Sequence, residues 1–130
     1  MYVRTAAVAA VAVTAFAAVP LHPATADEDR NHGRLFLTVS GSQNTWIRGV
    51  RLSCPEPRGH HPHAAEACER LRLAQGRPDA LPMERRLCTR EYDPVTATAE
   101  GDWNGRPVTW RKTFPNACAL EAATGAVFRF

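Results

Sequence analysis

The dipeptide Asn104-Gly105 separates two stretches in which apolar and polar residues alternate, at positions 95–99 and 108–114. Both residues of the dipeptide tolerate the positive backbone φ angles that a tight turn between antiparallel strands requires. Asn-Gly between two alternating segments is the strongest short-range signal for a β-hairpin. The pattern therefore predicts that the C-terminal half of the chain contains antiparallel sheet.

Weaker patterns on either side of this hairpin predict the other elements. Further strands are expected at residues 35–39, 46–52 and 126–130, and helices at residues 64–73 and 117–122. In the first of these helices, the side chains expected to face the core are those of Ala65, Cys68, Leu71 and Leu73. Because no strand–helix–strand alternation appears, we expect an α+β fold with a single antiparallel β-sheet of about five strands and two short α-helices.

The first 26 residues have the features of an export signal. Arg4 is their only charged residue, an apolar run follows at positions 6–19, and the small residues at 24–26 match a signal-peptidase site. The apolar run is shorter than the ~20 residues that a membrane-spanning helix needs. We therefore expect a cleaved secretory signal peptide at residues 1–26, a flexible mature N-terminus at 27–34, and one secreted, extracellular domain at 35–130 that has no membrane contact.

Charge and residue spacing argue against several classes of function. The formal net charge is only +3 and the arginines are scattered along the chain, so no affinity for nucleic acid is expected. No carboxylate pair has a recognisable catalytic spacing, and the serines lie in turns, so we expect no enzyme activity. His60, His61 and His63 lie in a proline-rich loop without helical spacing, and no cysteine pair has the CxxC spacing of a zinc finger. We therefore expect neither a metal site nor a cofactor.

The four cysteines all follow the export signal, at positions 54, 68, 88 and 118. An even number of cysteines in a short exported chain is typical of a disulfide framework. Three pairings are possible. The pairing Cys54–Cys68 with Cys88–Cys118 closes two modest loops without entangling the chain, and on a loop-entropy model each bridge would stabilise the fold by roughly 3–4 kcal/mol.

The segment at 87–95, Leu-Cys-Thr-Arg-Glu-Tyr-Asp-Pro-Val, carries the main functional signal. Arg90 lies two residues after a cysteine, and the rigid Asp93-Pro94 corner follows it. In an exported protein this pattern predicts an extended loop, held by a disulfide, that offers one basic side chain to a partner such as a serine protease. From the pattern alone, an inhibitory site, a protease substrate and an ordinary solvated arginine all remain open, and the solvated arginine is the simplest interpretation.

Taken together, these residues resemble the Streptomyces subtilisin inhibitor family, small secreted proteins that block serine proteases. The resemblance covers most of the mature chain, and the segments that carry it are 35–39, 52–54, 59–63, 87–88, 92–95, 103–108, 114–118 and 127–130. The Tyr-Asp-Pro-Val run at 92–95 and the aromatic C-terminus are its most specific parts. The resemblance implies the disulfides Cys54–Cys68 and Cys88–Cys118, and a homodimer that pairs sheet to sheet.

The same resemblance assigns roles within the loop. It implies a reactive bond between Arg90, as the P1 residue that enters the S1 pocket of the protease, and Glu91, as P1′. The other residues expected to contact the protease are Leu87, Cys88, Thr89, Tyr92 and Asp93. A carboxylate at the base of a trypsin-type S1 pocket would hold the guanidinium of Arg90, so trypsin-like proteases are the first expected partners. Subtilisin-like enzymes, whose S1 pocket is more permissive, come second.

Three features depart from the pattern of the family. Glu91 stands where an apolar residue is common, and Thr89 replaces a frequent proline. Arg85 and Arg86 precede the loop and offer a competing cleavage site. The alternative hypothesis is therefore a secreted protease substrate, or a cross-linking or interaction module, that keeps the fold without strong inhibition.

Overall fold

The computed structural model describes residues 7, 9–13, 15, 18 and 32–130. The export signal expected at residues 1–26 lies largely outside the described residues, as do residues 27–31 of the expected flexible N-terminus. In the described part of the chain, no helix combines the length and the apolar character that a membrane crossing requires.

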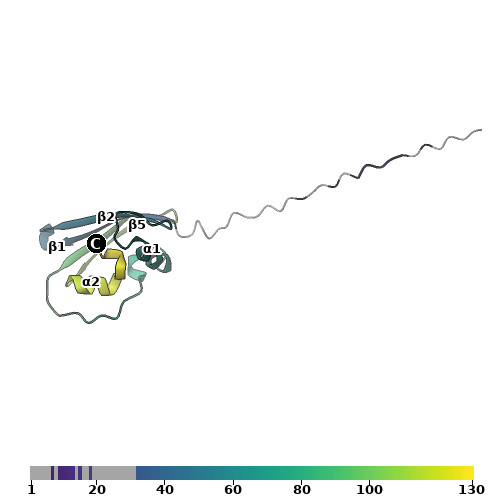
Figure 1. Cartoon of the computed structure of the whole chain (residues 1–130). Coiled ribbons are helices and arrows are strands. Elements are labelled where there is room, and N and C mark those ends of the chain that lie inside the picture. The colour runs from purple at the N-terminus through teal and green to yellow at the C-terminus, as the bar shows by residue number, and fades with distance from the viewer. Residues whose placement is uncertain (1–6, 8, 14, 16–17, 19–31) are drawn as a thin grey trace, which may run out of the picture.

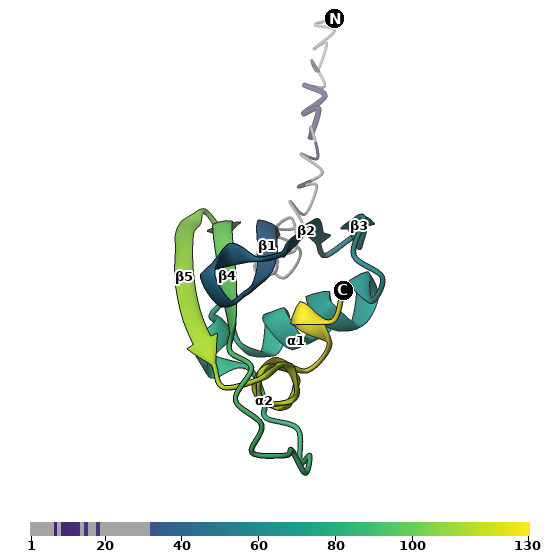
Figure 2. The ribbon, with the colours of Figure 1, turned by 90° about the vertical axis from the view of Figure 1, so that its left-hand side faces the viewer.

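One antiparallel sheet (Figure 1) contains five strands. Their spatial order is β3-β2-β1-β4-β5, which can be followed in Figure 2. The strands are β1 (Gly33–Gly41), β2 (Ile47–Cys54), β3 (Arg58–Gly59), β4 (Val95–Trp103) and β5 (Arg106–Phe114). The prediction of an α+β fold with a single antiparallel sheet is therefore confirmed. Because β1 begins at Gly33, the last two residues of the expected flexible N-terminus belong to the sheet. β3 was not predicted, since it is a two-residue strand inside a loop rich in proline and histidine.

The predicted Asn-Gly hairpin joins β4 to β5. Asn104 and Gly105 have φ angles of 51° and 75°, the left-handed conformation that a two-residue hairpin turn requires. Trp103 pairs with Arg106 directly beside the turn, and the register continues to Val95 opposite Phe114. The turn therefore fixes the register of two nine-residue strands.

Both helices, α1 (Ala64–Leu73) and α2 (Ala117–Thr124), lie on the same side of the sheet (Figures 1 and 2). Alternate residues of the strands point toward them, because successive side chains of a strand face opposite sides. From β1 and β4 these buried residues are Leu35, Leu37, Val39, Val95, Ala97 and Ala99. In the part of the chain that the structure describes, no helix covers the other face of the sheet.

The buried face of α1 differs from the predicted one. Ala67, Cys68 and Leu71 are buried, whereas Ala65 and Leu73 are exposed. Residues three and four positions apart share a helix face, but Leu73 lies about 200° around the axis from Leu71. The prediction was therefore correct for Cys68 and Leu71, in the middle of the buried face, and wrong for Ala65 and Leu73 at its two ends.

The strand predicted at residues 126–130 is wrong. The chain instead forms a 3-10 helix, η4 (Gly125–Phe128), after Gly125 ends α2 with a φ angle of 59°. Ala126, Val127 and Phe128 are all buried in succession. A strand at one face of a sheet buries only every second residue. This segment packs against α1, α2 and β1 at once. The short helix can therefore bury consecutive side chains.

Two disulfides connect these elements, and they have the pairing that the sequence analysis favoured. Cys54 at the end of β2 is joined to Cys68 in α1. Cys88 is joined to Cys118 in the first turn of α2. Each bridge therefore ties a helix to a segment distant from it in the sequence.

His61 is a buried polar group that links the loop before α1 to the C-terminal segment. Its side chain is only 6% exposed. The backbone N–H of His63 donates to Nδ1 of His61 at 2.9 Å, so Nε2 carries the hydrogen and donates to the carbonyl of Val127 at 2.8 Å. The ring also contacts Phe130 edge-on. Burial is the main cause that lowers the pKa of His61 below its ordinary value of 6.5; the hydrogen bond to Val127 partly opposes this, and the nearby His63 adds a smaller lowering.

Acidification below about pH 6.5 should therefore reduce the free energy of unfolding. The unfolded chain takes up the proton at the ordinary histidine pKa, whereas the folded chain takes it up only at a lower pH. The stabilisation is complete above about pH 6.5 and falls, by at most about 1.4 kcal/mol per pH unit, until the lowered pKa of the folded state is reached. Urea unfolding between pH 7.5 and 5 measures this slope. A His61→Gln variant should lose it and a His63→Gln variant should keep most of it, and equal slopes in all three proteins would contradict the assignment.

Candidate functional site

The segment at residues 82–94 contains no helix or strand and connects the 3-10 helix η3 (Pro78–Ala80) to β4. It extends past α2 at the end of the domain opposite β3 (Figure 2). Leu87 is fully exposed and Tyr92 is 79% exposed. All seven residues that the sequence analysis assigned to the protease-contacting loop lie in this one projecting segment.

A disulfide anchors this loop to α2. Cys88 is joined to Cys118, with the two Cα atoms 5.7 Å apart. The bridge attaches the chain two residues before Arg90, so the main chain there cannot move away from the helix. This attachment is the one that the sequence pattern predicted.

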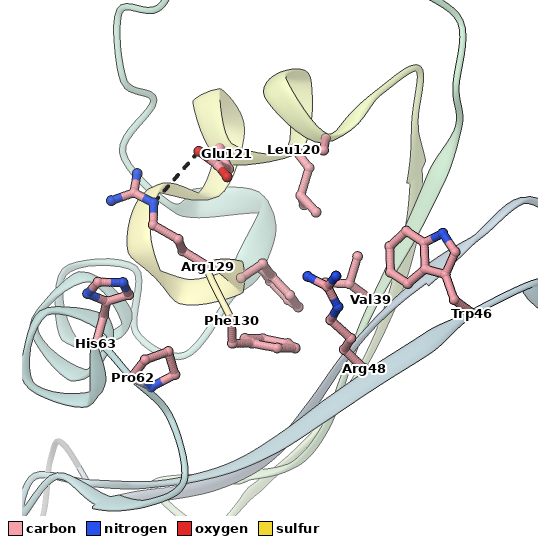
Figure 3. Close-up of a pocket in the computed structure, with 11 residues that line it drawn as sticks. Val39, Trp46, Arg48, Pro62, His63, Leu120, Glu121, Arg129 and Phe130 are labelled. Atoms are coloured by element: carbon pink, nitrogen blue, oxygen red, sulfur yellow. Dashed lines mark ion pairs between the residues drawn. The ribbon is translucent and has the colours of Figure 1, made fainter.

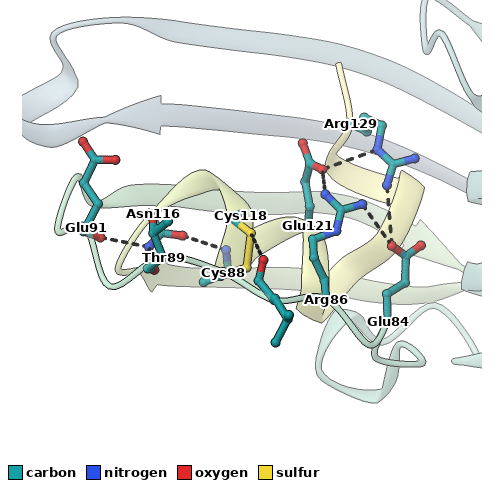
Figure 4. Close-up of a disulfide and its surroundings, with 11 residues drawn as sticks. Glu84, Arg86, Cys88, Thr89, Glu91, Asn116, Cys118, Glu121 and Arg129 are labelled. Carbon is teal, nitrogen blue, oxygen red and sulfur yellow. Dashed lines mark hydrogen bonds and ion pairs between the residues drawn. A yellow bond between two sulfur atoms is a disulfide. The ribbon is translucent and has the colours of Figure 1, made fainter.

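Asn116 supports the loop from the N-terminus of the same helix (Figure 4). Its Oδ1 accepts a hydrogen bond from the backbone N–H of Ala119 at 2.8 Å, which caps α2. Its Nδ2 donates to the carbonyl of Thr89 at 3.2 Å and to the carbonyl of Glu91 at 2.9 Å. One side chain therefore holds the carbonyls on both sides of Arg90, and the helix in turn fixes that side chain.

The segment after Arg90 is held by contacts to its main chain. The backbone N–H of Asp93 donates to the carbonyl of Pro115 at 2.9 Å. Ser42, in the turn between β1 and β2, reaches the carbonyl of Pro94 with its hydroxyl at 3.5 Å. Pro94 then leads directly into β4. The loop is thus fastened on both sides of Arg90.

The segment before the loop is held by charges. Two carboxylates, Glu84 and Glu121, contact three guanidinium groups, those of Arg70, Arg86 and Arg129. We call these five residues the carboxylate clamp, and Figure 4 labels all of them except Arg70. The shortest contact with a normal length joins Arg70 to Glu84 at 2.8 Å. The clamp joins α1, α2 and the C-terminal segment to the chain at residues 84–86.

The guanidinium of Arg70 lies over Gly125, which has no side chain. A Cβ atom on Gly125 would lie 2.6–2.8 Å from that guanidinium, so the end of the Arg70 side chain would have to shift. The guanidinium of Arg70 also contacts the carbonyl of Pro82 at 3.4 Å. The same glycine that ends α2 therefore leaves the space through which α1 contacts the start of the loop.

Arg90 itself is exposed, and no ion pair among the described residues involves it. In particular, its guanidinium is not paired with the neighbouring carboxylate of Glu91. Such a pair would have withdrawn the arginine from a partner. In the structure the side chain of Arg90 is available to solvent, on a main chain that is held in place.

A shallow groove of about 390 Å³ lies between α2, the C-terminal segment and the β1–β2 end of the sheet (Figure 3). Its lining includes Trp46, Arg48, Leu120 and Phe130, and none of the loop residues contributes to it. Within the described residues, no group of three or more histidine, cysteine, aspartate or glutamate side chains is arranged to hold a metal ion. The loop is therefore the candidate functional site.

Two of its supports were not identified from the sequence. The sequence analysis gave Asn116 no role in holding the loop, and it did not recognise the carboxylate clamp. The Asn side chain spans 25 and 27 positions to reach its two carbonyls, and no local pattern reports a contact at such a separation. The sequence offered one signal: Asn is a favoured helix N-cap residue, and Asn116 lies two residues before Cys118 of the expected disulfide framework.

A small domain that holds an extended, solvent-exposed segment by its main chain belongs to the class of proteins that present a preformed peptide loop to a partner. Comparison with known proteins narrows this class. The model of the subtilisin inhibitor-like family matches residues 32–116. This chain therefore belongs to the subtilisin inhibitor-like family, as its resemblance in sequence implied.

Individual relatives agree with this assignment. A Streptomyces fradiae protein named subtilase-type protease inhibitor is 50% identical over 86 residues, which cover 64% of this chain and 61% of that protein. The Streptomyces luteoverticillatus protease inhibitor SIL-V5 is 45% identical over 103 residues, which cover 74% of this chain and 95% of that protein. The match to a Streptomyces avermitilis relative likewise spans only 64% of that relative's length. The relatives are named as protease inhibitors rather than as enzymes.

A solved structure gives the same fold. The crystal structure of Streptomyces caespitosus sermetstatin in complex with Bacillus licheniformis subtilisin matches with a TM-score of 0.58 and 34% sequence identity. The match covers 76% of this chain and 98% of the matched chain.

Proposed function

We propose that this chain is a secreted inhibitor of serine proteases, in which Arg90 acts as the P1 residue and Glu91 as P1′. The observation that carries the proposal is the pair of hydrogen bonds from Asn116 to the carbonyls on either side of Arg90. The family of the chain, and a relative solved in complex with subtilisin, support the protease as the partner.

The proposed mechanism follows from how proteases bind peptides. A protease takes up its substrate as an added extended strand, so main-chain hydrogen bonds supply affinity and the P1 side chain supplies specificity. A flexible peptide must lose conformational entropy to bind in this way. A loop that is fixed by Cys88–Cys118 and Asn116 before binding avoids most of that cost.

The same supports would slow hydrolysis. Attack by the catalytic serine on the carbonyl of Arg90 would form an acyl-enzyme ester and release the amine of Glu91. Because Asn116 holds the carbonyl of Glu91, and Asp93 is bonded to Pro115, that amine stays beside the ester. It can attack the ester and re-form the peptide bond before water does. The loop would then bind like a substrate and remain largely uncut.

Arg90 favours trypsin-like targets within this proposal. A trypsin-type S1 pocket has a carboxylate at its base to pair with the guanidinium, whereas an apolar pocket would have to desolvate an unpaired charge. That cost is several kcal/mol. We expect trypsin-like proteases as the first targets and subtilisin-like proteases as the second.

Titration of a known concentration of trypsin, and in parallel of subtilisin, with the purified protein from residue 27 onward tests the proposal. An inhibitor removes trypsin activity in proportion to its concentration up to about one equivalent per enzyme, and mass spectrometry finds the chain mainly intact. A substrate leaves the activity unchanged and is progressively cut at its arginines. The second outcome would favour the alternative function, that of a secreted substrate or interaction module.

We also propose that the chain forms a homodimer through the open face of its sheet, as members of its family are expected to do. Both helices lie on the other face (Figure 1). Phe36 and Ile47 are 45% and 62% exposed, and their positions in β1 and β2 place them on this open face, opposite the buried Leu35 and Leu37. Two copies that pack sheet to sheet would bury these apolar side chains.

Sedimentation velocity at micromolar concentration tests the dimer. A Phe36→Asp variant should sediment as a monomer, because a buried unpaired carboxylate at the interface is strongly unfavourable. Leu73→Asp is the matched control, since Leu73 is 58% exposed on α1 and lies on the other side of the sheet. A monomeric unmodified protein, or equal effects of both substitutions, would exclude this interface.

A further inference from the structure

Three arginines lie within six residues of one another at the loop, at positions 85, 86 and 90. A trypsin-like protease accepts arginine at P1 in any segment that can bind in extended form, so each of the three is a chemically suitable target. The proposed function requires that the protease engage Arg90 and leave the other two uncut. In the structure, Arg85 and Arg86 differ from Arg90 in how their side chains and main chain are held.

The guanidinium of Arg86 is already occupied. It contacts the carboxylate of Glu121, and the carboxylate of Glu84 at 3.4 Å. The three side chains are partly buried, with 35%, 30% and 24% of Arg86, Glu121 and Glu84 exposed. To enter an S1 pocket, Arg86 would have to break both ion pairs. The two carboxylates would then lose one of the positive charges that neutralise them. Arg90 makes no such contact with any described residue.

Arg85 is exposed, but both of its neighbours are fixed. The backbone N–H of Glu84 donates to the carbonyl of Ala122 at 2.8 Å, and the side chains of Glu84 and Arg86 belong to the carboxylate clamp. A protease that took Arg85 as P1 would need the main chain on both sides of it to lie extended in its cleft. The contacts of residues 84 and 86 keep that segment against α2 instead.

Arg129 and Arg70 complete the clamp on the side away from the loop. Arg129 contacts Glu84 at 3.6 Å and Glu121 at 3.7 Å (Figure 3 shows the second pair). Arg70 contacts Glu84 at 2.8 Å. Each carboxylate is therefore held by cations from the body of the domain, so that it stays in place to receive Arg86.

From this arrangement we propose that the carboxylate clamp determines which arginine a trypsin-like protease engages. By occupying the guanidinium of Arg86 and fastening residues 84–86 to α2, the clamp withholds Arg85 and Arg86. Of these three arginines, Arg90 is then the one whose guanidinium makes no ion pair with a described residue and whose main chain is held from both sides by Asn116. The inference rests on the proposed inhibition, since it explains how one bond rather than three is presented. Glu84 and Glu121 are positioning residues that need not touch the protease.

The double substitution Glu84→Gln with Glu121→Gln tests the clamp, because it removes both charges and nearly preserves the shapes of the side chains. The protein with and without the double substitution, each also carrying Arg90→Leu so that binding at Arg90 does not inhibit the protease, is incubated with a catalytic amount of trypsin, reduced, and analysed by mass spectrometry over time. Hydrolysis consumes one water and leaves a new carboxylate on the arginine and a new amine on the next residue, so each cut site is identified by its fragments. We expect cleavage after Arg85 or Arg86 to be about tenfold faster in the variant. Arg86 loses its two partly exposed ion pairs, and the combined stabilisation by two such pairs corresponds to about a tenfold change in an equilibrium constant.

Glu69→Gln is the matched control. Glu69 forms an exposed ion pair with Arg72 at 2.6 Å on α1, and neither residue belongs to the clamp. This variant carries the same kind of substitution and should be cut at the rate of the unmodified protein. If it accelerates cleavage after Arg85 or Arg86 as much as the double variant does, the effect is a general loss of stability and the inference is overturned.

Two further readouts keep the inference testable. The single variant Glu121→Gln should show an intermediate rate, and it serves in place of the double variant if that protein does not fold, as judged by its thermal unfolding. An unchanged rate of cleavage at 85 and 86 in a folded variant would overturn the inference even if the unmodified protein inhibits trypsin. Conversely, faster cleavage at these two sites in the variant, together with no inhibition by the unmodified protein, would support the clamp and reject the proposed inhibition.

Discussion

Replacing Arg90 with leucine should weaken the binding of trypsin by at least about a hundredfold. The substitution leaves the carboxylate in a trypsin-type S1 pocket buried without a partner, and removal of one member of a buried ion pair costs about 3–5 kcal/mol. Residues that enter a central pocket of an interface account for most of its binding energy. Titration curves at several enzyme concentrations give the inhibition constants of both proteins.

The same variant should bind subtilisin at least as well as the unmodified protein does. A more permissive, apolar S1 pocket accepts leucine without desolvating a charge. Arg77→Leu is the control, because Arg77 is an exposed arginine just before η3 and lies outside the loop. Equal losses with both substitutions, or a fall in affinity for both enzymes with Arg90→Leu alone, would mean that Arg90 is not the residue that enters S1.

Replacing Asn116 with serine should convert a lasting inhibitor into a temporary one. Serine is as good a helix N-cap as asparagine, but its shorter side chain cannot reach the carbonyls of Thr89 and Glu91. The loss of two hydrogen bonds of about 1 kcal/mol each predicts an acceleration of cleavage between Arg90 and Glu91 of roughly ten- to thirtyfold. Activity should return as the loop is cut, and fragments ending at Arg90 should accumulate.

Asn116→Ala separates the support of the loop from the cap of the helix. This variant loses both roles, so its free energy of unfolding should fall by about 1 kcal/mol relative to the serine variant, while its loop is cut at a similar rate. If the serine variant resists cleavage as well as the unmodified protein does, the hydrogen bonds to the loop do not protect the reactive bond. The disulfide alone would then have to explain the protection.

The parts of the fold that were predicted correctly depend on local chemistry. Asn104-Gly105 specifies a tight turn whatever surrounds it, and the alternation on either side fixes which faces of β4 and β5 are buried. The C-terminal segment was misassigned for the opposite reason. Val127 and Phe128 are buried by elements that lie far away in the sequence, and a short apolar run does not distinguish a strand from a helical turn packed on several sides.

The candidate site divides in the same way. The exposed loop, its cysteine and its arginine are contiguous, so residues 87–93 could be chosen from the sequence and the family resemblance. The groups that hold the loop and the segment before it come from Asn116, Glu121 and Arg129. Each lies 25 or more positions after its partner in the sequence: Asn116 contacts Thr89 and Glu91, Glu121 contacts Arg86, and Arg129 contacts Glu84. Their partners exist only after the chain has folded, which is why no motif identified them.

The supports of the loop act almost entirely on its main chain, and this has a consequence for how such a protein can diversify. Asn116 contacts carbonyl groups, which every residue has, while the side chains of Leu87 and Tyr92 project into solvent and pack against little of the domain. Apart from Cys88, the side chains at residues 87–92 are therefore interchangeable without a large effect on the stability of the fold. Under selection by changing proteases, or in a library randomised at these positions, one unchanged scaffold could acquire many different targets.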